Sequence, residues 1–183
     1  MLARADLVIA HNAGFDRPFV ERRIPVFADF PWACSFADID WKAQGQGSAK
    51  LESLAQALGY FYDAHRAEMD CHALLAVLGV PLAANRGNAM QTIVAASTQP
   101  SYRLQATGAP FDSKDALKAR GYRWDAESKV WYTAVKSTEA LDAEAEWLKS
   151  EVYGGRAARI GLETQDALVQ FSSRSGKSGD RVL

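Results

Sequence analysis

The sequence lacks the features that mark several large classes of protein. No apolar run reaches the roughly 18–20 residues that a membrane-spanning helix needs, so no membrane partner is expected. Two cysteines are too few for a disulfide framework, and neither a Cys-x-x-Cys pair nor a Cys/His metal spacing occurs. The net charge is −1, so the overall balance indicates no polyanionic partner. The opening residues MLARAD are too polar for a signal peptide, and we expect a reduced, cytoplasmic protein.

The chain has an ordinary globular composition, 48% hydrophobic and 23% charged, over 183 residues. This length suits one full domain or two small ones. Because the residue pattern changes near position 100, we expect an α/β unit over 1–82 and a small α+β module over 101–153, joined by a helical connector over 83–100. The last stretch, 154–183, carries Gly, Ser, Arg and Lys without periodicity, and we expect a flexible tail there.

The first chemically suggestive segment follows a predicted strand. Residues 6–10 contain the aliphatic run Leu-Val-Ile-Ala, which is typical of a strand buried in a covered sheet. The chain then continues as HNAGFD, residues 11–16, where we expect a turn through Gly14 and a helix that begins at Asp16. This places a carboxylate at the corner between a strand and a helix.

The second segment is HRAEMD, at the start of a helix predicted over about 67–78. Five residues on a regular helix turn through about 500°, so His65 and Asp70 would point apart if both were helical. They can share a site if His65 lies in the loop before the helix and Asp70 in its second turn. An imidazole can take a proton from water near neutral pH, and carboxylates suit Mg²⁺. With Asp16, these residues indicate metal-assisted hydrolysis.

Each of these side chains also has a simpler interpretation when taken alone. Asp16 is then a helix N-cap or first-turn residue, and Asp70 a solvated helix residue. His65 is then a surface histidine. His11 and His72 have no acid at a diagnostic spacing, so we interpret both as structural.

The two segments together resemble the DEDDh family of 3′–5′ exonucleases, to which the proofreading epsilon subunit of bacterial DNA polymerase III belongs. The second motif of that family, a strand-end His-Asn followed by Phe-Asp, is matched by His11, Asn12, Phe15 and Asp16. The third motif, a histidine five residues before an aspartate, is matched by His65 and Asp70. The resemblance covers about residues 5–80 and implies a partial ribonuclease H-like exonuclease fold with only these two motifs.

This resemblance implies a role for each matched residue. Asp16 and Asp70 would bind metal and His65 would be the catalytic general base, while Asn12 and Phe15 would bind substrate by shaping the floor of the nucleotide pocket. Two Mg²⁺ or Mn²⁺ ions would clamp the attacking and leaving oxygens during hydrolysis of the 3′-terminal phosphodiester. The expected partners are single-stranded DNA or RNA, 3′ ends, and polymerase or other replication and repair proteins.

The first motif of the family, Asp-x-Glu on the opening strand, is absent. Only fifteen residues precede Asp16, and the single acid among them is Asp6. Asp38-x-Asp40 and Glu163 do not lie on an aliphatic strand with the required spacing. Because two carboxylates and one histidine should hold metal weakly, we expect little or no nuclease activity from this chain.

Three functions stay open at this point. The chain is an exonuclease, either shortened or completed by sequence upstream of Met1, or it is a non-catalytic nucleic-acid-binding or interaction protein built on a remnant of that fold. The third is a hydrolase of other chemistry that uses only His65 and Asp70.

The stretch 110–135 resembles a small strand–helix–hairpin module found on bacterial exonuclease-like proteins. It interleaves cations with aromatic residues: Lys114, Lys118, Arg120, Arg123 and Lys129 with Tyr122, Trp124, Trp131 and Tyr132. Single-strand-binding proteins combine these two side-chain types. The alternative is that aromatics, above all Trp124 and Trp131, fill a small core under one helix.

Overall fold

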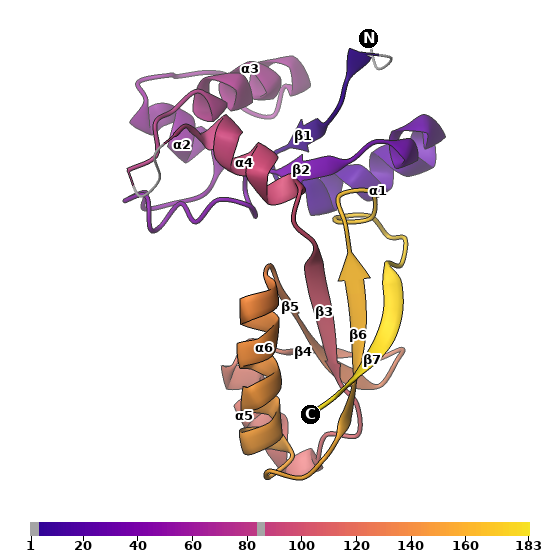
Figure 1. Ribbon diagram of the computed structural model, residues 1–183. Coiled ribbons are helices and arrows are strands. Elements are labelled where there is room, and N and C mark those ends of the chain that lie inside the picture. Colours follow the sequence, from indigo (N-terminus) through magenta and orange to yellow (C-terminus); the bar gives the residue numbers. More distant parts are fainter. Residues whose placement is uncertain (1–3, 84–86) are drawn as a thin grey trace. The chain divides into compact units, whose positions relative to one another are not determined.

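The computed structural model describes residues 4–83 and 87–183. The chain divides into two compact units (Figure 1). Unit 1 comprises Met1–Thr98 and Ala167–Ser173, and unit 2 comprises Gln99–Asp166 and Arg174–Leu183. Because helices and sheets occur together, the expectation of an α/β protein is confirmed. Within the described residues, no helix is both long enough and apolar enough to cross a membrane.

Unit 1 is organised around two short parallel strands, β1 (Val8–Ala10) and β2 (Trp32–Cys34). Parallel neighbours need a crossover connection, and α1 (Ala13–Arg23) with the 3₁₀ turn η2 (Pro25–Asp29) supplies it. Three further helices complete the unit: α2 (Leu51–Ala57), α3 (Ala67–Leu78) and α4 (Ala89–Ser97).

The core of unit 1 forms where these helices bury apolar residues beside β2. Its buried members include Ala33, Leu54, Ala73, Val77 and Ile93. Helix α4 contributes Ile93 to this core, so it is part of unit 1 and the predicted connector over 83–100 is wrong; positions 84–86 of that range lie outside the described residues. The apolar face of α4 is evident in the sequence, but the core that it joins is set by tertiary packing.

A buried arginine joins α1 to a distant part of the chain. Arg17 has no exposed surface, and its Nε donates to Glu21 Oε1 at 2.7 Å. Its guanidinium also donates to three backbone carbonyl oxygens of one segment: Ala167 at 2.9 Å, Leu168 at 2.5 Å and Gln170 at 2.7 Å. Residues 167–173 therefore belong to unit 1, although they come after most of unit 2 in the sequence.

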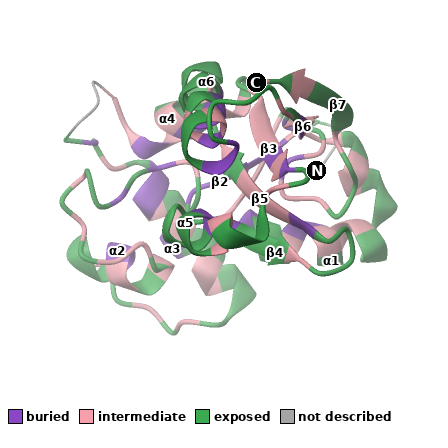
Figure 2. Cartoon of the chain, turned by 90° about the horizontal axis from the view of Figure 1, so that it is seen from below, coloured by how far each residue is buried: buried purple, intermediate pink, exposed green. Residues whose placement is uncertain are grey.

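Unit 2 is an antiparallel sheet with the strand order β4-β5-β3-β6-β7. The strands are β3 (Ser101–Ala106), β4 (Arg123–Asp125), β5 (Val130–Val135), β6 (Arg159–Gln165) and β7 (Lys177–Val182). One face is covered by α5 (Lys114–Ala119) and α6 (Thr138–Trp147), with short helical turns η3 (Phe111–Ser113) and η4 (Leu148–Val152) beside them (Figure 1). Helix α6 is exposed on one side and buries Leu141 and Ala145 on the other (Figure 2).

The segment 154–183 is not a flexible tail, and that prediction is corrected. It contains β6 and β7, so unit 2 extends beyond the predicted boundary at 153. Ile160 of β6 is fully buried and packs in the same core as Leu104 of β3. Strand β7 is an edge strand that is held mainly by backbone pairing to β6. It therefore does not depend on alternating apolar residues, and its sequence KSGDRV has none.

We predict that Arg17→Ala lowers the free energy of unfolding by about 3–5 kcal/mol, because it removes the cation that pairs with the Glu21 carboxylate and the hydrogen bonds that this cation donates to several buried carbonyl groups. Arg22→Ala, an exposed change on the same helix, is the matched control and should alter stability by no more than about 0.5 kcal/mol. Urea unfolding followed by circular dichroism measures both. Equal values for the two variants would contradict this account of Arg17.

Candidate functional site

The first group of predicted site residues lies at the corner between β1 and α1. Asn12 turns the chain with a left-handed backbone (φ 67°, ψ 47°), a conformation that asparagine tolerates better than most residues. Helix α1 begins at Ala13, three residues earlier than predicted, so Asp16 lies within its first turn. A carboxylate there is stabilised by the partial positive charge of the helix N-terminus.

The second group lies at the start of α3 and meets the condition for a shared site, except that Asp70 is in the first turn of the helix and not in the second. His65 is in the turn before the helix and has a left-handed backbone with φ 68°. Asp70 is inside the helix, and its backbone N–H donates to the Arg66 carbonyl at 2.9 Å. The break in helical geometry at His65 removes the angular separation that a continuous helix would impose on His65 and Asp70.

The two corners line one hollow in unit 1, with a volume of about 670 Å³. Four of the five predicted residues are on its walls: Asn12, Asp16, His65 and Asp70. Phe15 is not among the lining residues and its side chain is 76% exposed. Adjacent helical residues point about 100° apart, so the side chain that follows Phe15 can face the hollow while Phe15 itself does not.

The carboxyl groups of Asp16 and Asp70, which both line this hollow, have different surroundings. Burial raises the pKa of the Asp16 carboxyl. The Tyr62 hydroxyl forms a hydrogen bond with the Asp70 carboxylate. Burial first, and then this bond and the charge of Asp70, raise the pKa of Tyr62 to about 12. The raised pKa keeps Tyr62 neutral at physiological pH.

Sequence reasoning missed several residues of the hollow, among them Lys50, Glu52 and Tyr62. Tyr62 lies three residues before His65, a spacing that carries no helical signal because the segment between them is a loop. Lys50 and Glu52 are at the start of α2, and their approach to the other residues depends on how α2 packs.

His11 also lines the hollow, and its contacts are those of a structural residue. Its Nδ1 lies 2.8 Å from Ser35 Oγ, and its ring meets the Phe36 ring edge-on with the centroids 5.6 Å apart. Burial lowers the pKa of His11, which favours a neutral imidazole near pH 7.

The acids considered as substitutes for the absent motif lie elsewhere. Asp38 Oδ2 accepts from the Cys34 backbone N–H at 2.7 Å, and Asp40 Oδ1 accepts from that of Ala43 at 3.0 Å, so both stabilise turns. Glu163 is on β6 in unit 2. Across 4–83 and 87–183, no group of three or more His, Cys, Asp or Glu side chains is arranged to hold a metal ion.

We predict that Asp70→Asn lowers the pKa of Tyr62 from about 12 toward the usual value for tyrosine, because the variant removes the negative charge that opposes the phenolate. Burial remains, so the fall is partial. Nuclear magnetic resonance of ¹³Cζ-labelled tyrosine over an alkaline pH series measures the shift, with Glu68→Gln on the exposed side of α3 as the control. An unchanged pKa in Asp70→Asn would contradict the contact.

Comparison with models of protein families, with curated proteins and with solved structures finds no match to this chain. The function therefore has to be argued from the side chains of the hollow and their chemistry.

Proposed function

We propose that unit 1 is a ribonuclease H-like unit of the DEDDh 3′–5′ exonuclease type, which acts on DNA or RNA in the cytoplasm. It binds the 3′-terminal nucleotide of a strand in the hollow and has little or no hydrolytic turnover as this chain. The observation that carries the proposal is the convergence of Asn12, Asp16, His65 and Asp70 on one hollow, from two segments about fifty residues apart.

The residues of the chain suit the handling of a phosphodiester end. His65 is exposed, so a water molecule can reach its imidazole, the side chain that most often acts as a general base in enzymes. Tyr62 and Asp70 line the same hollow, and their contact raises the pKa of Tyr62, so the tyrosine is a neutral group beside this carboxylate. Lys50 is a cation on the same hollow and can neutralise part of the charge of a bound phosphate.

The donor set fits one weakly held Mg²⁺ or Mn²⁺ better than two. Mg²⁺ is commonly bound through one or two carboxylates together with substrate phosphates and water, and Asp16 and Asp70 are two such carboxylates. The raised pKa of Asp16 supports this fit, because a desolvated carboxylate gains from a nearby cation. When bound, the ion would neutralise charge on the substrate phosphate.

The same donor set favours the second candidate function, a nucleic-acid-binding protein without catalysis. Efficient phosphodiester hydrolysis by this route needs two ions fixed on the attacking and leaving oxygens. Glu52 also lines the hollow, but within the described part of the chain no three His, Cys, Asp or Glu side chains are arranged to hold a metal ion. Binding without turnover is therefore the outcome that the geometry supports.

The binding half of the proposal predicts a preference for free 3′ ends. With Mg²⁺ present, a linear strand ending in a 3′-hydroxyl should bind more tightly than a circular strand of the same sequence, measured by fluorescence anisotropy. Asp70→Asn should abolish this preference, because it removes one of two carboxylates, whereas Glu68→Gln should retain it. Equal affinity of the native chain for linear and circular strands would exclude 3′-end binding.

The catalytic half predicts that a 3′-labelled single strand is cleaved no faster by the native chain than by Asp70→Asn, with Mg²⁺ or Mn²⁺ supplied. The physical reason is the incomplete ligand set. Product release is followed by gel electrophoresis. Metal-dependent turnover that Asp70→Asn eliminates would show that the site is an active nuclease.

A further inference from the structure

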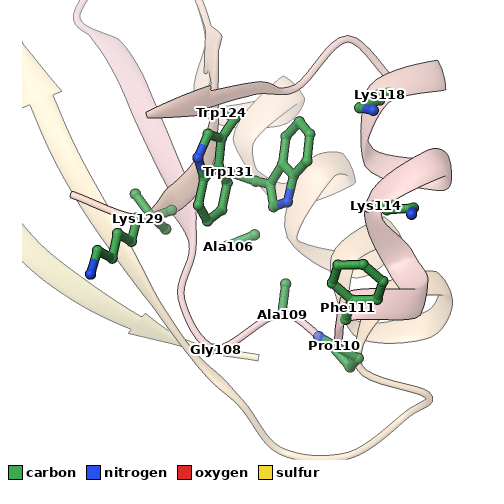
Figure 3. Close-up of a pocket in the computed structure, with 11 residues that line it drawn as sticks. Ala106, Gly108, Ala109, Pro110, Phe111, Lys114, Lys118, Trp124, Lys129 and Trp131 are labelled. Carbon is green, nitrogen blue, oxygen red and sulfur yellow. The ribbon is translucent and has the colours of Figure 1, made fainter. Parts of the chain in front are cut away.

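A second hollow, with a volume of about 540 Å³, lies in unit 2 between α5 and the β4–β5 hairpin (Figure 3). Three aromatic rings surround it, those of Phe111, Trp124 and Trp131. Small residues from the 106–110 stretch, among them Ala106 and Gly108, also line it. The volume is in the range of sites that hold small organic groups.

The aromatic rings of this hollow are unusually exposed. Trp124 is 50% exposed and Phe111 is 78% exposed, and Trp124 lies on β4, the edge strand of the sheet. Trp124 and Trp131 are paired across the two strands, with their ring centroids 5.4 Å apart. Trp131 is partly buried and packs against the core of unit 2, which includes the buried Tyr122, whereas Trp124 does not belong to that core. Trp124 therefore presents a ring face to a ligand.

Three lysines flank the rings. Lys114 Nζ lies 4.4 Å from the centre of the Phe111 ring, and Lys118 Nζ lies 5.9 Å from that of Trp131. Lys129 is on the opposite side of Trp124 (Figure 3). Within the described chain none of the three is in an ion pair, and the lining contains no acidic residue.

We propose that this hollow binds single-stranded nucleic acid, with a base against the rings of Trp124, Trp131 and Phe111 and with neighbouring phosphates on the lysines. Every base has a π-face, so stacking of this kind is independent of sequence. Three unpaired ammonium groups around an apolar hollow complement a polyanion, whereas a neutral peptide would leave them uncompensated. The site needs neither a free 3′ end nor hydrolysis, and is thus independent of the function proposed for unit 1.

The test uses the full chain and a short circular oligothymidylate with an internal fluorophore, which offers no 3′ end to unit 1. Anisotropy is measured in EDTA over a series of salt concentrations. Trp124→Ala should weaken binding roughly ten-fold, because it removes one stacking face. The double variant Lys114→Ala/Lys118→Ala should reduce the slope of log affinity against log salt by about 1.4, since each single-strand phosphate contact contributes about 0.7.

Matched controls separate these effects from general damage. Lys177→Ala removes an exposed lysine of the same unit outside the hollow, and Phe61→Ala removes an exposed ring from unit 1; neither should alter affinity or slope. Trp124→Phe retains a ring and should keep most of the affinity, which excludes misfolding as the cause of loss in Trp124→Ala. Absence of binding by the native chain at low salt would overturn the proposal. The same holds if the variants of Trp124, Lys114 and Lys118 have the affinity and salt slope of the controls. Displacement by thymidine monophosphate as readily as by oligothymidylate would also overturn it, because it would indicate a free-nucleotide site.

Discussion

The guanidinium of Arg17 carries a full positive charge and has no exposure to water. The arrangement of unit 1 depends on the oxygen atoms that accept hydrogen bonds from this group. Burial of an unpaired cation is prohibitively costly, so the surrounding chain has to supply oxygen atoms at hydrogen-bond distance. Glu21 supplies a carboxylate, and the segment 167–173 supplies backbone carbonyls. The same segment accepts the Trp32 backbone N–H at 2.8 Å, which ties it to β2 as well.

This network acts close to the candidate site. Arg17 directly follows Asp16 on α1, so the interactions that fix the inward side of the helix also limit the rotation of the turn that carries the carboxylate. The Trp32 ring lies 5.4 Å from the Arg17 guanidinium and is itself buried in β2. Residues distant in sequence thus set the orientation of a motif that sequence reasoning could treat only as local.

The sequence predicted those features that depend on local pattern. The helix predicted over about 67–78 is α3, which has these bounds. The angular spacing of helical residues required His65 to lie before this helix if it shares a site with Asp70, and His65 does lie there; Asp70 is in the first turn rather than the second. Features that depend on distant partners were not predicted. An arginine in an amphipathic helix normally faces solvent, so nothing local marked Arg17 as buried.

The two hollows differ in the sign of their charge. The one in unit 1 presents acidic side chains and an imidazole, and phosphate can approach it only with help from a cation. The one in unit 2 presents ammonium groups and aromatic faces, and attracts a strand by itself. By the two proposals, one chain combines a site for a strand terminus with one for the interior of a strand.

The return of residues 167–173 to unit 1 has a consequence for the covalent connectivity of the molecule. The backbone passes from one unit to the other between 98 and 99, again between 166 and 167, and a third time between 173 and 174. A protease that cuts between 98 and 99 leaves residues 167–173 of unit 1 covalently attached to unit 2, and only non-covalent contacts, such as those of Arg17, then hold residues 1–98 to that segment. Neither unit corresponds to one uninterrupted stretch of coding sequence, so recombination at a single point cannot exchange one unit and leave the other whole.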